Sequence, residues 1–247
     1  MLPEITPEEL SASLDEVAVE VLDEAGIDGP PVDALTIARR LGITIACDER
    51  QRGRARYVRL GDARGRKSRP TILLRPEPRW ERRQWAVAHE IGEHVAHRVF
   101  GRLSVDPRET AADAREKTAT HLASRILLPG PWFRVDGPAC AWDLLGLKSR
   151  YTTASHELIA RRMLDLQPPV IVTIFDHGRV YFRGSNVFGR VPPPSSGEMA
   201  CWRTVHTRGD PHQASDGLRT VQAWPVHEPG WKREILRTEV EEEYVDV

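Results

Sequence analysis

The segment that most constrains the fold of this 247-residue chain runs from about Trp80 to Phe100. Apolar residues recur there at spacings of three and four, which predicts a long helix with one buried face. They are Trp85, Ala88, Ile91, Val95 and Val99. A second helix with an apolar stripe is expected from about Thr110 to Leu128, ending at Pro129. Both stripes must be buried, so we expect the two helices to pack together.

The first of these helices carries the segment Ala88-His-Glu-Ile-Gly-Glu-His-Val-Ala-His97. Positions i and i+4 of a helix lie on one face. The zinc-peptidase pattern HExxH uses this spacing, with two histidines that hold the metal and a glutamate that activates the metal-bound water. His89 and Glu90 match the first two positions, but Glu93 stands where the second histidine belongs, and His94 follows it.

Two interpretations of this departure are open. In a regular helix, Glu93 lies about 40° around the axis from His89, whereas His94 lies about 140° away. A one-residue bulge would instead bring His94 beside His89, and such bulges occur at functional sites. Geometry favours Glu93, while the better-established chemistry of two-histidine zinc sites favours His94. Glu93 is our preferred ligand because it requires no distortion, with His94 as the alternative.

A zinc site needs a third protein ligand and usually leaves the fourth position to water. Glu116, in the first half of the second helix, is the candidate that packing of the two helices would bring within reach. We therefore predict a Zn²⁺ site formed by His89, Glu93 and Glu116, with Glu90 as the general base. A second carboxylate ligand weakens the Lewis acidity of the metal, which predicts slow, selective turnover.

The chain resembles the ImmA/IrrE-type metallopeptidases, whose first motif reads roughly AHExGHxxxH. The family's second motif, roughly E-x-x-A-N-x-F-A-x-x-L-L-x-P, is matched in spacing with three substitutions. The corresponding residues are Glu116, Ala119, Thr120, Leu122, Ala123, Ile126, Leu127 and Pro129. The resemblance covers about residues 25 to 165 and aligns without a gap when Glu93 takes the place of the second histidine.

The resemblance implies a zinc endopeptidase that cleaves a helix–turn–helix transcriptional repressor and thereby switches on a stress, prophage or defence response. Two other classes stay open. A catalytically inactive relative that binds metal or a partner is supported by the missing second histidine. A DNA-binding regulator would use the pair of short helices around Thr152, whose second member, Ser155 to Leu166, supplies only a weak basic face.

The expected fold is α+β, with a zincin-like helical peptidase core and a small sheet. The strand candidates of that sheet are Ile43–Ala46, Arg56–Leu60 and Thr71–Leu74. Pro168-Pro169 reads as a hinge, so we expect a metallopeptidase domain over 1–167 and a small mixed or β-rich domain over 168–247.

The expected C-terminal domain begins with a β-hairpin whose turn is Asp176-His-Gly178. We expect only short strands and loops after that hairpin. No motif matches the domain, and a sensory or regulatory role is expected because some relatives carry a sensor-like domain at this place.

Composition excludes several other classes of protein. The formal net charge of -1 argues against a dedicated nucleic-acid binder, which usually carries a basic excess. No apolar run approaches the roughly 20 residues that span a bilayer. The three scattered cysteines, Cys47, Cys140 and Cys201, are typical of reduced thiols, so we expect a cytoplasmic protein without a membrane partner.

Overall fold

The computed structural model describes residues 5–61, 68–106, 112–166, 168–187, 189–216 and 219–240. Parts of the loop predicted after Phe100, and the helix start predicted at Thr110, lie outside these residues. Contacts divide the chain into two compact units, Met1–Val135 with Arg150–Ser155, and Asp136–Ser149 with His156–Val247. The domain boundary expected near 168 stays a prediction.

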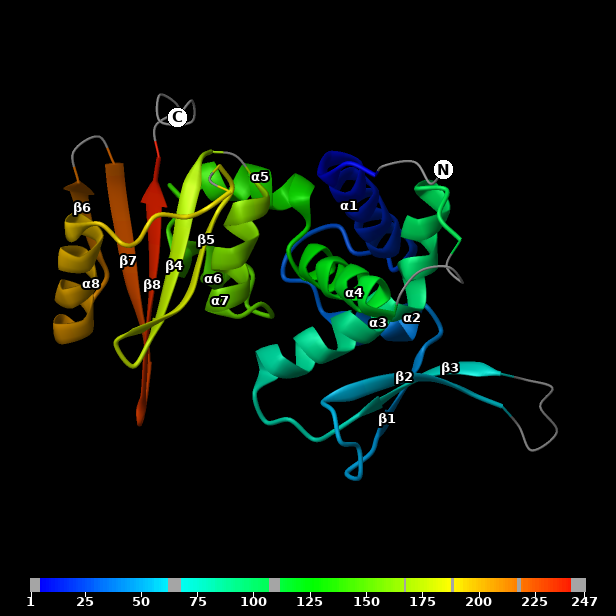
Figure 1. Ribbon diagram of the computed structural model, residues 1–247. Helices are drawn as coiled ribbons and strands as arrows, with labels where there is room; N and C mark the ends of the chain where they lie inside the picture. The colour runs from blue at the N-terminus through cyan, green and yellow to red at the C-terminus, as the bar shows by residue number, and fades with distance from the viewer. Residues whose placement is uncertain are drawn as a thin grey trace. The chain divides into compact units, whose positions relative to one another are not determined.

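The first unit contains a three-stranded sheet formed by β1 (Thr44–Cys47), β2 (Ala55–Leu60) and β3 (Arg69–Leu74). Its order is β1-β3-β2, with β1 parallel and β2 antiparallel to β3. The three predicted strands are therefore present. Since β3 occupies the centre, β2 is an edge strand, and one of its sides is open to other elements (Figure 1).

Two long helices, α3 (Trp80–Arg102) and α4 (Ala112–Leu127), form the core of the first unit and lie side by side in Figure 1. The predicted apolar stripes are buried at their interface, as Ile91, Val95 and Leu122 show. All of α3 lies within the described residues, and it is α-helical throughout, without a one-residue bulge.

Two further helices, α1 (Pro7–Glu24) and α2 (Ala34–Arg40), hold α3 in place. Gln84 of α3 is buried, where its Oε1 accepts from the Ala34 N–H at 2.7 Å and its Nε2 donates to Asp33 at 2.7 Å. These bonds satisfy the first turn of α2 and fix the start of α3. Apolar residues of α1, such as Leu14 and Val17, are fully buried.

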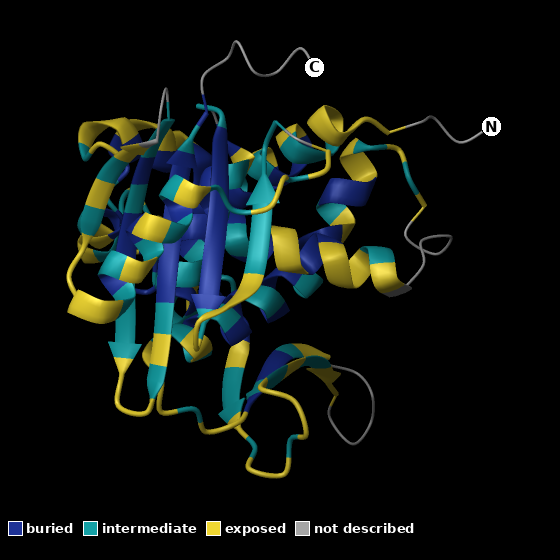
Figure 2. Cartoon of the chain, turned by 60° about the vertical axis from the view of Figure 1, so that its left-hand side comes forward, coloured by how far each residue is buried: buried dark blue, intermediate teal, exposed yellow. Residues whose placement is uncertain are grey.

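The second unit is built on a five-stranded antiparallel sheet of order β5-β4-β8-β7-β6. Its strands are β4 (Val170–Asp176), β5 (Arg179–Ser185), β6 (His212–Asp216), β7 (Arg219–Glu228) and β8 (Trp231–Glu239). Buried residues concentrate on the inner strands, as Figure 2 shows for this sheet.

The predicted β-hairpin is formed by β4 and β5. His177 and Gly178 of its turn have φ angles of 48° and 77°, which is the backbone of a type I′ turn.

The helices of the second unit include α6 (Leu144–Arg150), α7 (His156–Arg162) with a 3₁₀ turn at Met163–Asp165, and α8 (Ser196–Arg208). Helix α5 (Gly130–Ala139) begins in the first unit and ends in the second. The segment expected to hold only short strands and loops thus contains a 13-residue helix, α8, and that expectation was wrong.

A capping box between Ser195 and Glu198 begins α8. Cys201 and Val205 then bury one face of the helix among apolar residues of the sheet.

Both units combine helices with small sheets, which confirms the α+β class. None of the helices in the described part of the chain has the length and apolarity needed to cross a bilayer.

Candidate metal centre

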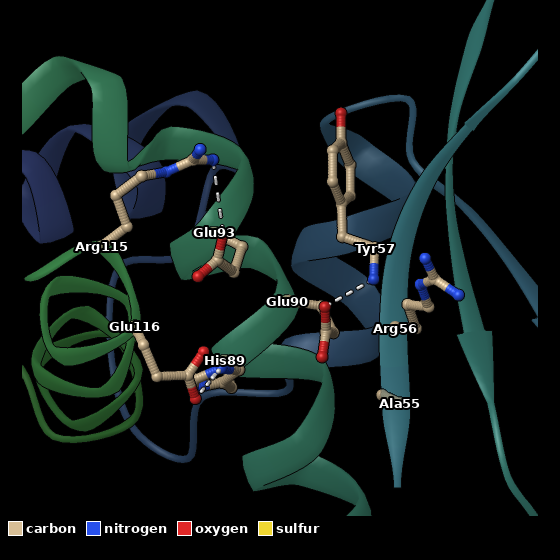
Figure 3. Close-up of a pocket in the computed structure, with 8 residues that line it drawn as sticks. All are labelled: Ala55, Arg56, Tyr57, His89, Glu90, Glu93, Arg115 and Glu116. Carbon is tan, nitrogen blue, oxygen red and sulfur yellow. Dashed lines mark hydrogen bonds and ion pairs between the residues drawn. The ribbon is translucent and has the colours of Figure 1, made fainter. Parts of the chain in front are cut away.

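A pocket of about 480 Å³ opens between α3, α4 and the edge strand β2. Helix α3 contributes three residues to its lining, α4 two and β2 three (Figure 3). They are His89, Glu90, Glu93, Arg115, Glu116, Ala55, Arg56 and Tyr57. The structure thus gathers all four of the preferred site residues in one place.

The three preferred ligands face one another across the α3–α4 interface. Nε2 of His89 lies 3.3 Å from Oε1 of Glu116. One donor atom from each of His89, Glu93 and Glu116 falls within 4.8 Å of the others. His89 and Glu93 share a face because α3 is regular, as the four-residue spacing predicts.

The close crossing of the two helices depends on Gly92. A Cβ atom at this position would lie 2.6 Å from the carbonyl oxygen of Ala119, a distance that real contacts do not reach. Glu116 lies three residues before Ala119, on the neighbouring turn of α4. The missing side chain at Gly92 therefore lets α4 approach closely enough for Glu116 to reach His89.

Glu90 leaves α3 toward β2 rather than toward α4. Its Oε2 accepts a hydrogen bond from the Tyr57 backbone N–H at 2.5 Å, and the residue is only 9% exposed. Burial raises the pKa of Glu90, and the charges of Glu93 and Glu116 add to this effect. The Tyr57 N–H and His89 act in the opposite direction. Glu90 therefore holds its proton more readily than an ordinary glutamate does.

His94 lies one turn after Glu90 and faces the same strand. Its Nδ1 is 2.8 Å from the Tyr57 hydroxyl oxygen, and the two rings stand 5.2 Å apart. Burial lowers the pKa of His94, as do the nearby cations of Arg59 and Arg98. The structure does not bring His94 to the group formed by the preferred ligands. The choice between Glu93 and His94 as a metal ligand stays a prediction.

His97, at the later histidine position of the motif, lies on the exposed side of α3. Its Nδ1 is 3.0 Å from the carbonyl oxygen of His94 in the same helix. This contact does not join it to the group of preferred ligands.

Tyr57, Arg56 and Arg115 line the pocket but were not predicted as site residues. Nη2 of Arg115 lies 3.7 Å from Oε2 of Glu93. Tyr57 sits on a strand and meets α3 more than thirty residues along the chain, so no local spacing reveals the contact. Arg115 precedes Glu116, and an adjacent arginine is common on helix surfaces without any functional meaning.

The donor set fits zinc, which accepts imidazole nitrogen and carboxylate oxygen alike. Glu90, Glu93 and Glu116 bring three carboxylates into one pocket, where His89 lies 3.3 Å from Glu116 and Arg115 lies 3.7 Å from Glu93. This surplus of negative charge favours a divalent cation. Glu116 is largely exposed and free to adjust toward a bound ion.

Comparison with known proteins agrees with this geometry. The sequence profile of the IrrE N-terminal-like domain, peptidase family M78, matches residues 38–163. A solved structure of a Mycobacterium tuberculosis transcriptional regulator superimposes with a TM-score of 0.65 at 16% sequence identity, covering 92% of this chain and 75% of that one. This likeness shows a shared fold. No curated protein matches the sequence.

The matched range spans just over half of the chain and contains every residue of the pocket. The chain therefore belongs to the IrrE N-terminal-like family, a family of the zinc metallopeptidase type.

Proposed function

We propose that this protein is a zinc-dependent endopeptidase that cleaves a helix–turn–helix transcriptional repressor to switch on a stress, prophage or defence response. The observation that carries the proposal is the convergence of donor atoms from His89, Glu93 and Glu116 within 4.8 Å, beside the buried Glu90. Membership of a metallopeptidase family supports the reaction class.

In the proposed mechanism His89, Glu93 and Glu116 hold the zinc. When bound, the ion polarises the scissile carbonyl and lowers the pKa of an adjacent water. Glu90 acts as the general base. Its Oε2 is held by the Tyr57 N–H, so Oε1 is the oxygen that takes the proton of the attacking water and later delivers it to the leaving amine.

The edge strand β2 supports a peptide as the substrate. The Tyr57 N–H points away from β3, because Glu90 accepts its hydrogen bond. Backbone groups alternate in direction along a strand, so those of Ala55 and Arg59 point the same way as those of Tyr57. An extended substrate can add to such an edge and place a peptide bond beside the carboxylates.

A repressor partner follows from the family resemblance, and the structural neighbour is itself a transcriptional regulator. Such a substrate places the peptidase in the cytoplasm, in agreement with three free cysteines. We further propose that residues 1–167 carry the peptidase activity, while 168–247 have a sensory or regulatory role.

The test uses the purified chain refilled with zinc and the product of a neighbouring reading frame that encodes a small helix–turn–helix protein. Intact-mass spectrometry should detect two complementary fragments of that protein. The Glu90→Gln variant, which keeps the ligand set, should produce none. A zinc-loaded wild type that leaves several such proteins intact would favour the catalytically inactive relative.

A DNA-binding role for the helical pair α6 and α7 is disfavoured by the surroundings of the two arginines in α7, the expected recognition helix. Arg161 pairs with Glu157 at 2.9 Å and stacks over the Phe182 ring. Arg162 is buried and pairs with Asp165 at 2.7 Å. Both arginines of α7 are thus already paired with carboxylates, which disfavours phosphate binding by this helix. A gel-shift assay at low salt should show no retention of DNA.

A further inference from the structure

Arg115 stands beside the substituted ligand position and has a specific partner there. It lies in the first turns of α4, immediately before Glu116, and its Nη2 is 3.7 Å from Oε2 of Glu93 (Figure 3). Its side chain is 51% exposed, whereas that of Glu93 is 22% exposed. A cation near a helix N-terminus is disfavoured by the helix dipole, so the pairing with Glu93 offsets an otherwise unfavourable position.

The charges of the two residues balance. A site with a neutral histidine at position 93 carries one negative charge among its three ligands, contributed by Glu116. Glu93 adds a second negative charge, and Arg115 compensates it with a positive one. The pair therefore returns the ligand shell to the net charge of a two-histidine site.

Arg115 also competes with a bound metal. A carboxylate oxygen that faces a guanidinium is a weaker donor to another cation, and a fixed positive charge within a few ångströms repels a divalent ion. Both effects lower metal affinity. They also withdraw electron density that Glu93 would otherwise supply to the metal.

We infer that Arg115 is a positioning residue that pairs with Glu93. It thereby offsets the negative charge that Glu93 adds in place of a second histidine, and it weakens the binding of a divalent metal. This inference rests on the proposed function, because it takes the pocket as a metal site. It predicts that removal of Arg115 tightens metal binding, and that most of this gain depends on a carboxylate at position 93.

The test is a Zn²⁺ affinity measured by chelator competition on the metal-free full chain. Arg115→Ala should bind zinc about three- to thirtyfold more tightly than wild type, and Arg115→Lys should lie between the two. Lys117→Ala is the matched control, because this substitution also removes one positive charge from α4. Lys117 pairs with Asp113 at 2.8 Å rather than with Glu93. Its affinity should stay within about twofold of wild type.

The double variant Glu93→His/Arg115→Ala, compared with Glu93→His alone, completes a cycle. The gain in zinc affinity from Arg115→Ala should be smaller when position 93 is a histidine. Unchanged or weaker zinc binding in Arg115→Ala, with an unaltered circular dichroism spectrum, would overturn the inference while leaving the metal site standing. No zinc binding by the wild type would overturn the proposed function, and the inference with it.

Discussion

Two clusters of histidine and glutamate in this molecule use the same residue types for opposite purposes. In the second unit, Glu234 is fully buried at 0% side-chain exposure. It accepts from Nδ1 of His206 at 2.9 Å, from Nε2 of His227 at 2.7 Å and from Trp202 Nε1 at 3.0 Å. These three hydrogen bonds to the carboxylate are all donated by side chains of the protein itself.

The pocket of the first unit is arranged differently. His89, Glu93 and Glu116 are partly exposed, and their donor atoms converge on a shared space. Among the His, Cys, Asp and Glu side chains that the structure describes, these three are the one group of candidate metal ligands whose donor atoms all lie within 4.8 Å of one another. A buried carboxylate whose oxygens already accept hydrogen bonds from the protein has a structural role. Donor atoms that converge at an open pocket are instead available to bind a ligand such as a metal ion. Composition alone does not separate the two cases.

The largest expected effect is on catalysis. Glu90→Gln removes the proposed general base but keeps all three proposed ligands, so the rate of repressor cleavage should fall by roughly 10²- to 10⁴-fold. Zinc content should not change. His206→Ala, in the other cluster, should cleave at the wild-type rate. A Glu90→Gln variant as active as wild type would contradict the assigned role.

A pH effect follows from a second contrast between buried carboxylates. Burial alone would raise the pKa of Glu198, as it does for Glu90, but Arg183 donates to both its oxygens at 3.0 and 2.9 Å. Together with hydrogen bonds from Thr238 and Ser195, this leaves the pKa of Glu198 below its usual 4.5.

The stability that Glu198 contributes is therefore present above that usual pKa and is lost as the pH falls through the lowered value. Arg183→Ala should cost about 3–5 kcal/mol of unfolding free energy at pH 7. The difference in unfolding free energy between this variant and the wild type should narrow as the pH falls. Urea titrations at several pH values measure this, and a difference that grows toward acid would contradict the sign.

The Glu234 cluster should respond to mutation as a structural element. Glu234→Leu leaves the N–H groups of Trp202, His206 and His227 without their acceptor, so the free energy of unfolding should fall by about 1–3 kcal/mol. The matched change Glu93→Leu should cost less than about 0.5 kcal/mol in the metal-free protein. Equal losses of unfolding free energy for the two variants, measured by urea denaturation, would contradict the distinction between the two clusters.

The smallest expected effect concerns the substituted ligand. Glu93→His restores two histidines, which should strengthen the Lewis acidity of a bound metal and raise turnover severalfold. Steady-state cleavage rates at matched metal content measure the change. A rate clearly below wild type, with zinc content unchanged, would count against Glu93 as a charge-donating ligand.

The sequence predicted the parts of the site that local spacing determines. His89, Glu90 and Glu93 follow from the period of one helix, and Glu116 follows from the apolar stripe that packs α4 on α3. Tyr57 was missed because its bond to Glu90 joins a strand to a helix distant along the chain.

The fold was predicted to a similar extent. The strands of the first unit, the hairpin of β4 and β5 and the two long helices were identified. Strands β6, β7 and β8 were expected only as short strands without bounds, and the helices α5 and α8 were missed, although Ser195 and Glu198 already form a capping-box pattern in the sequence. The buried face of α8 holds Glu198 beside Cys201 and Val205, so its apolar period was weak, and the Pro-, Gly- and Ser-rich surroundings favoured a loop.

The most direct test of the central claim is metal content by elemental analysis, after refilling with zinc. Five variants accompany the wild type: His89→Ala, Glu93→Ala, His94→Ala, Glu116→Ala and His206→Ala. We predict about one zinc per chain in the wild type, lost in the His89, Glu93 and Glu116 variants and kept in the other two. Loss of zinc in His94→Ala, with zinc retained in Glu93→Ala, would show that His94 rather than Glu93 is the third metal ligand. A wild type that holds no zinc would contradict the account.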